Sequence, residues 1–244
     1  HGTDNNVYYY YRVFQLKFGL PVNHVKDEVS SFKANKHIAT NGGSRAVLYD
    51  DDNKRFVRHI NNEATSTLMP EGTLFDFNTG KDLVYMTYSA YNGGEVFAIL
   101  KDPNDGKYWL ARFIFSSSIS QVYYEEMTAT DIENASNFAV SPEFGYIMYN
   151  AGSKVYSYDF NNKASKLMLD YGPKSISHIK FHSFISGKYA EMRNQLIVCS
   201  YDEADKTGSG KMEMFKVKPV QGEFELAREF TGLGKIVSLS YRER

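Results

Sequence analysis

Three histidines lie in predicted strands, at positions that could bring their imidazole rings together. His178 and His182 are four residues apart on a predicted strand, so both side chains should face the same way, and His37 opens another short apolar run. Imidazole is a common zinc ligand, but a zinc site needs a third ligand that converges from elsewhere in the chain. The spacing supplies none, so we predict no metal site and interpret these histidines as polar groups around a wet channel.

Acidic clusters recur in three predicted turns, at residues 50–54, 102–106 and 159–162. The first cluster could offer carboxylates to calcium, but it lacks the ligand spacing and the distal Glu of an EF-hand loop. Asp, Asn, Pro and Gly also favour tight turns without any ion. We therefore interpret all three clusters as turns.

Motifs of known hydrolases are missing from the sequence. It contains neither Gly-x-Ser-x-Gly nor His-Glu-x-x-His. Glu125 and Glu126 are adjacent, so on a strand they would point in opposite directions and make a poor catalytic pair. Residues 207–211 (Thr-Gly-Ser-Gly-Lys) lack the first Gly and the final Ser or Thr of a phosphate loop. Cys199 lies in an apolar run, as a buried thiol would. We predict no catalytic residue and no cofactor.

Aromatic residues are abundant, with 19 Tyr and 17 Phe. Most should pack between sheets, where aromatic burial contributes strongly to the core. Some could stack on sugar rings while neighbouring polar groups bind the hydroxyls. Polar strands facing a channel, and the loops above it, provide our candidate ligand-binding set: His37, Arg45, Tyr91, Asn92, His178, Tyr189 and Arg193. The alternative for the insertion 182–194 is simple packing against its neighbour.

Charge and hydropathy exclude several classes of protein. The 28 basic and 29 acidic residues nearly cancel, which argues against nucleic acid as a partner. No stretch approaches the roughly 18 apolar residues of a membrane-spanning helix. We therefore expect no membrane span in this chain.

A degenerate repeat organises the chain. Short apolar runs begin at residues 37, 82, 137 and 175, and each leads into two aromatic-rich strand patterns that flank a turn. These runs start 45, 55 and 38 residues apart. Degenerate four-stranded units at intervals of roughly 40–50 residues are typical of β-propellers. The sequence therefore predicts an all-β fold, a β-propeller of four-stranded antiparallel blades, with residues 1–244 as a single domain.

The two ends of the chain suggest a shared closing blade. Residues 234–241 resemble the run 174–181, and we expect residues 235–241 to pair in one sheet with the strand 7–12 or a neighbour. Residues 14–18 would form another strand, and the polar stretch 23–36 a connector with at most one helical turn. Four full blades plus part of a closing blade result, in a chain that is expected to be a fragment of a longer parent.

Several short segments resemble a known family, the PKD-like lipoproteins of Bacteroidetes that are encoded beside glycan-uptake systems. The resemblance is carried by residues 4–9, 19–22, 32–34, 37–40, 49–56, 135–140, 154–159 and 232–237. It implies a lipid-anchored parent on the outer-membrane surface, with an immunoglobulin-like PKD region before the propeller. The anchor cysteine and the PKD region are absent from these residues, and the family offers no catalytic residues to carry over.

Three functions are compatible with these features. The resemblance favours a non-catalytic cell-surface binding module, for glycan in a nutrient-uptake system, with glycan or surface uptake-complex proteins as partners. The alternatives are a propeller enzyme acting on polysaccharide, as a glycosidase or lyase, and a protein-interaction scaffold. A paired-carboxylate pocket with perturbed pKa values would favour the enzyme.

Overall fold

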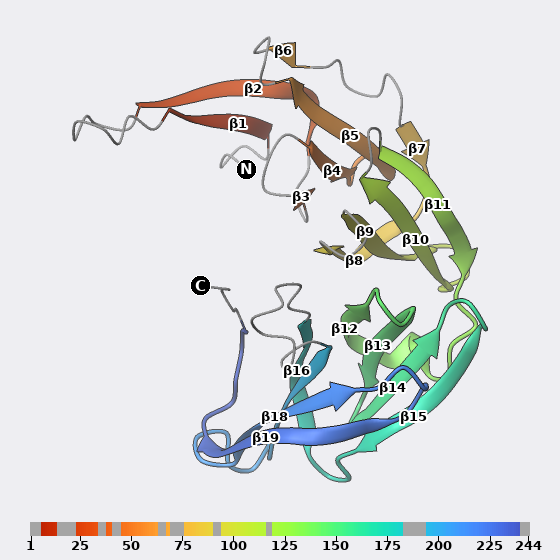
Figure 1. Cartoon of the computed structure of the whole chain (residues 1–244), viewed down its shortest axis with the longest axis vertical. Helices are drawn as coiled ribbons and strands as arrows, with labels where there is room; N and C mark the ends of the chain where they lie inside the picture. Colours follow the sequence, from red (N-terminus) through yellow and green to blue (C-terminus); the bar gives the residue numbers. More distant parts are fainter. Residues whose placement is uncertain are drawn as a thin grey trace. The chain divides into compact units, whose positions relative to one another are not determined.

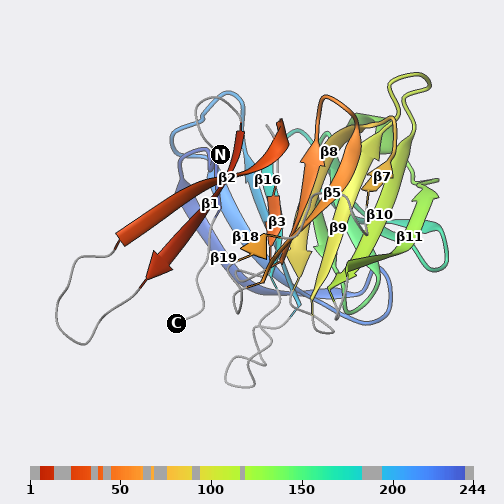
Figure 2. The ribbon, with the colours of Figure 1, turned by 90° about the horizontal axis from the view of Figure 1, so that it is seen from above.

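The computed structural model describes residues 6–13, 23–33, 38–40, 45–62, 67–68, 76–89, 94–115, 119–182 and 194–239 (Figures 1 and 2). Within these residues the regular structure is β-strand, apart from one 3-10 turn, η3 (Ile132–Asn134). The chain divides into two compact units, one of His1–Asp105 with Leu110–Tyr124 and the other of Gly106–Trp109 with Glu125–Arg244.

The first unit begins with a two-stranded antiparallel sheet of β1 (Asn6–Val13) and β2 (Asn23–Lys33). The next sheet contains β3 (Ile38–Thr40), β4 (Arg45–Asp50) and β5 (Arg55–Asn62), and β5 also pairs with the short strands β6 (Thr67–Leu68) and β7 (Asp76–Asn78). A four-stranded sheet follows in chain order, from β8 (Asp82–Ser89) through β9 (Glu95–Lys101) and β10 (Tyr108–Phe115) to β11 (Ile119–Glu126). Its last two strands contribute residues to both units.

The second unit holds two four-stranded antiparallel sheets. One consists of β12 (Ala135–Ser141), β13 (Tyr146–Ala151), β14 (Lys154–Asp159) and β15 (Ala164–Asp170). The other consists of β16 (Ser175–His182), β17 (Gln195–Tyr201), β18 (Gly210–Val217) and β19 (Phe224–Leu233). In both, each strand pairs with the next along the chain.

The burial pattern explains why these segments form stacked sheets. All seven residues of β17 are buried, as are the first six of β9 and the first five of β13. A strand buried on both faces must lie between two covering layers, so alternation of apolar and polar residues is lost. In the second unit Met148 and Val155 share a core cluster with Val198 and Phe215, so its two sheets pack face to face.

These sheets confirm the predicted fold class. The chain is all-β, and three of its described sheets are four-stranded and antiparallel, in the up-and-down order of propeller blades. The sheet of β3–β7 has five strands, and that of β1 and β2 has two. The single-domain expectation for residues 1–244 stays a prediction.

Two local predictions were wrong. Residues 23–33 form β2 rather than a polar connector, with pairs such as Tyr11↔Val25 and Tyr9↔Asp27. A polar segment of weak strand propensity can be held in a strand by the partner that its backbone pairs with. Residues 234–239 are irregular rather than a strand. The rest of that predicted strand, and the one predicted at 14–18, lie outside the described residues.

Candidate functional site

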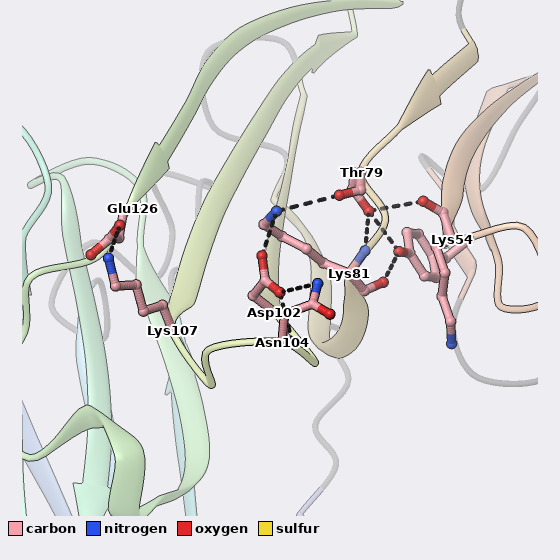
Figure 3. Close-up of polar contacts among 8 residues, drawn as sticks. Lys54, Thr79, Lys81, Asp102, Asn104, Lys107 and Glu126 are labelled. Atoms are coloured by element: carbon pink, nitrogen blue, oxygen red, sulfur yellow. Dashed lines mark hydrogen bonds and ion pairs between the residues drawn. The ribbon is translucent and has the colours of Figure 1, made fainter.

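A buried tyrosine, Tyr49, anchors the main polar network of the first unit. Figure 3 shows the network's other members, Thr79, Lys81 and Asp102. Tyr49 lies in β4 with no exposed surface, and its hydroxyl bonds Thr79 Oγ1 at 2.8 Å and the backbone carbonyl of Lys81. Thr79 Oγ1 in turn donates to the carbonyl of Lys54 at 2.9 Å. Burial raises the pKa of Tyr49 far above its ordinary value. The phenol is therefore a neutral hydrogen-bonding group that joins the 50–54 turn to the segment leading into β8.

An ion pair continues this network. Lys81 Nζ lies 3.0 Å from Asp102 Oδ2, and their side chains are only 12% and 18% exposed. The two residues meet because Lys81 precedes β8 and Asp102 follows its antiparallel neighbour β9, where Asp82 pairs with Lys101. Asp102 also accepts the backbone N–H of Asn104 at 2.9 Å.

The protonation states of this pair are firmly set. Burial opposes the charge of Lys81, but its hydrogen bonds to Asp102 and Tyr124 outweigh that effect and raise the pKa of the ammonium. The amide of Asn104 and the ammonium of Lys81 lower the pKa of Asp102. Burial raises the pKa of the Tyr124 phenol. A permanently charged pair beside a neutral phenol can hold a loop in place, but it is not poised to exchange protons near neutral pH.

A second buried carboxylate in this unit, that of Glu95, also forms an ion pair. Glu95 begins β9 and has no exposed surface. Arg112 donates to both of its carboxylate oxygens, from Nη2 to Oε1 at 2.5 Å and from Nε to Oε2 at 3.1 Å. The guanidinium also lies 5.7 Å from the centre of the Phe97 ring. Two parallel hydrogen bonds of this kind fix the orientation of the guanidinium against the carboxylate.

In the second unit, the glycine-rich loop between β17 and β18 is held by hydrogen bonds among its own residues. Asp205 Oδ1 accepts the backbone N–H groups of Thr207 and Gly208, at 3.2 and 3.0 Å, together with the Thr207 hydroxyl. Those amides would be the donors of a phosphate site, so an internal carboxylate already occupies the position of a phosphate. The chain turns at residues 207–208 and enters β18 at Gly210.

Tyr201, at the end of β17, lies beside this loop. Its hydroxyl donates to Glu203, whose pKa falls to about 2 because Lys206 and then Tyr201 hydrogen-bond to it. Lys235 Nζ lies 4.6 Å from the centre of the Tyr201 ring, within the range of a cation–π contact. The carboxylate here is thus ionised and partnered.

The histidines of β16 lie on one face with Lys180 between them. His182 is 3% exposed and His178 is half-buried. Burial, followed by the charge of Lys180, lowers the pKa of both imidazoles, that of His182 to about 4. Both are therefore neutral at pH 7. Within the described ranges no three His, Cys, Asp or Glu side chains are grouped as ligands of one ion.

The acidic turns use their carboxylates internally. Asp50 Oδ1 accepts the amides of Asp52 and Asn53, at 3.2 and 3.1 Å, and Asp159 Oδ1 accepts the two corresponding amides of its own turn. Lys54 and Lys163 close the two turns with the same positive φ of 54°. The same turn therefore occurs twice, and the backbone amides satisfy the oxygens that calcium would need.

The structure describes two of the seven candidate ligand-binding residues. His178 lies in β16 as predicted. Arg45, which we expected in a loop, instead begins β4 opposite Ile60, and its side chain is outside what is described. The remaining five lie outside the described residues: His37, Tyr91, Asn92, Tyr189 and Arg193. The candidate set as a site stays a prediction.

Our sequence reasoning missed the network of Tyr49, Thr79, Lys81 and Asp102. One signal could have pointed to it. In the predicted hairpin of residues 82–101, Lys81 and Asp102 directly flank the two strands, and antiparallel pairing places such flanking residues at the same end. Opposite charges at those positions predict an ion pair.

Comparison with known proteins gives likeness in fold alone. No family model matches the chain, and no curated protein matches its sequence. Similar solved structures include a candidate 6-phosphogluconolactonase from Bacteroides uniformis (14% identity, TM-score 0.48, 88% of this chain and 62% of that one) and a luciferin-regenerating enzyme (10%, 0.41, 86% and 66%). A protein from Lactobacillus plantarum is also similar (12%, 0.34, 86% and 74%). This chain thus spans less than two thirds of the length of the first two structures, and no family is assigned by these likenesses.

Proposed function

We propose that this chain is a non-catalytic binding module of the cell surface, which binds glycan in a nutrient-uptake system. The observation that carries the proposal is the state of its carboxyl groups. Wherever a carboxyl pKa departs from its ordinary value in the described residues, it is lowered: Asp50, Asp102, Glu203, Asp205 and Glu225. A glycosidase needs a carboxylic acid that stays protonated near neutral pH, and hence a raised pKa. The observed carboxylates suit hydrogen bonding rather than acid catalysis.

Glycan as the ligand follows from the chemistry of the candidate residues. Sugars present C–H faces that can stack on Tyr rings, and hydroxyls that bind Asn, Arg and His. Tyr91 with Asn92, and Tyr189 with Arg193, combine both kinds of group within a few residues. Exposed turn residues such as Asn161 add further amide groups on the described surface.

The cellular setting is proposed from the resemblance to PKD-like lipoproteins of Bacteroidetes. It supports a parent protein held at the outer-membrane surface by a lipid anchor in its N-terminal part, with uptake-complex proteins as further partners. The described residues contain no helix long and apolar enough to cross a bilayer.

A glycan array, run beside an activity screen on plant and host polysaccharides, tests the proposal. We expect retention of at least one glycan without cleavage, and roughly two- to tenfold weaker binding after Tyr91→Ala or Tyr189→Ala. Val220→Thr, a change at an exposed turn residue of the second unit, is the matched control and should bind as the unaltered chain does.

The other outcomes point to the alternative functions. Cleavage that is abolished by substitution of a single carboxyl residue would overturn the proposal in favour of a polysaccharide-degrading enzyme. Neither binding nor cleavage across the panel would overturn it in favour of a protein-interaction scaffold.

A further inference from the structure

The segment 234–239 combines strand-forming residues with an irregular, unpaired backbone. Its sequence, Gly-Lys-Ile-Val-Ser-Leu, is rich in β-branched and aliphatic residues, which favour strands. Figure 1 nevertheless shows it as a plain coil that leaves the end of β19. Within the described part of the chain, Ile236, Val237 and Ser238 make no hydrogen bond. Val237 is 80% exposed.

The segment is nevertheless held at both ends. The backbone N–H of Lys235 donates to the Lys206 carbonyl at 2.7 Å, and Lys180 Nζ donates to the Leu239 carbonyl at 2.8 Å. At the start, the carbonyl of Gly234 is so close to Gly210 that a Cβ added there would lie 2.2 Å from its oxygen. Two anchors about a strand's length apart hold the three intervening residues, of which Val237 and Ser238 are exposed and Ile236 is half-buried. Holding the segment in this way lowers the entropy cost of pairing it.

Exposed backbone of this kind is a template for strand addition. We infer that residues 235–239 of two copies of this chain pair as antiparallel strands about a twofold axis at Val237. This self-association is independent of the proposed glycan binding.

The pairing is self-complementary. With Val237 opposite Val237 of the second copy, Ile236 lies opposite Ser238 and Lys235 opposite Leu239. No two like charges are directly opposed, and a β-branched pair lies at the centre, as favourable cross-strand pairing requires. The Lys235 ammonium is directed to the ring of Tyr201 in its own chain, which leaves the strand edge clear. In a twofold interface both copies use the same surface, so residues 235–239 form both halves of the contact.

Cysteine cross-linking tests the register directly. The only native cysteine, Cys199, is buried, and burial raises the pKa of its thiol to about 11, so Val237→Cys adds the one accessible thiol. Directly opposed residues of antiparallel strands are close enough for a disulfide. We expect Val237→Cys to form a disulfide-linked dimer at least tenfold faster than Val220→Cys, a matched control at another valine that is 57% exposed. Equal rates for the two variants would overturn the inference.

Sedimentation of the unaltered chain provides the second readout. We expect a concentration-dependent dimer whose dissociation constant rises at least tenfold in Val237→Asp, where two carboxylates would face each other. Val237→Thr keeps the β-branched shape and should dimerise as before. An unaltered chain that stays monomeric into the hundreds of micromolar range would overturn the inference.

Discussion

Gln221 and Ala164, 57 residues apart in sequence, join the two sheets of the second unit. Gln221 lies in the β18–β19 turn, and its Nε2 donates to the carbonyl of Ala164 at 2.9 Å and to that of Ser157 at 3.1 Å. Two further bonds reinforce the contact, from Tyr146 Oη to the Pro219 carbonyl and from Lys166 Nζ to the Gln221 carbonyl. One turn thus fastens the sheet of β16–β19 to that of β12–β15.

Removing this amide should weaken the unit. Gln221→Ala removes the donor of two partly exposed hydrogen bonds, and we expect the free energy of unfolding to fall by about 0.5–1.5 kcal/mol. Urea denaturation followed by circular dichroism measures the change. Glu223→Ala, two residues along the same turn, is the control and should alter stability by less than about 0.5 kcal/mol. Equal effects of the two substitutions would show that the side-chain bonds of Gln221 contribute nothing.

The backbone of the same turn makes a second prediction. Gly222 has φ +82°, and an added Cβ would lie 2.4 Å from Lys166 Cδ, so Gly222→Ala must displace the Lys166 side chain that bonds Gln221. Gly152 also has a positive φ, of +57°, but has nothing within 4 Å of an added Cβ. Both alanines carry the cost of a left-handed backbone, about 1 kcal/mol. We expect Gly222→Ala to lower the melting temperature clearly more than Gly152→Ala, and a reversed order would contradict the packing described.

The pKa of His182 predicts a pH dependence of stability. The imidazole titrates near 6.5 when unfolded and near 4 when folded. Between these values the unfolded chain binds a proton that the folded chain does not, so stability falls as the pH drops from about 6.5 toward 4. The loss from this residue is at most about 3 kcal/mol.

Denaturation curves at several pH values check this effect. His182→Gln cannot take up the proton and should flatten the profile between pH 4 and 6.5. His178→Gln, at the more exposed histidine of the same strand face, should flatten it less. An unchanged slope in His182→Gln would refute the assignment.

The Glu95–Arg112 pair predicts a large asymmetry between single and double substitutions. Arg112→Met strands a fully buried carboxylate and should cost about 3–5 kcal/mol of the free energy of unfolding. The double variant Glu95→Gln with Arg112→Met should recover part of that loss, because the buried charge is gone. Lys107→Met provides the control, since its ion pair with Glu126 (Figure 3) is 51% and 35% exposed and should be worth less than about 1 kcal/mol.

Much of the fold could be predicted from local sequence. The apolar runs at 96–100, 146–149 and 195–201 are central strands, and the Asp- and Asn-rich turns at 50–54 and 159–163 fold as turns because each Asp carboxylate binds the amides just after it. Both signals act over a few residues, so neither needs the rest of the molecule. The candidate ligand-binding set stays untested, because five of its seven residues lie outside the described part of the chain.

The sequence by itself thus determined an all-β chain of four-stranded units, because strand alternation and turn geometry are local properties. Only the tertiary structure decided that residues 23–33 form a strand, since pairing with β1 overrides their weak propensity. It also decided that residues 234–239 do not, since no described strand pairs with them. Stacking of sheets likewise decided which distant groups meet, such as Gln221 with the carbonyl of Ala164. Such contacts depend on how one sheet packs on another. The spacing of residues along the chain does not predict which side chain of one sheet will reach which carbonyl of the next.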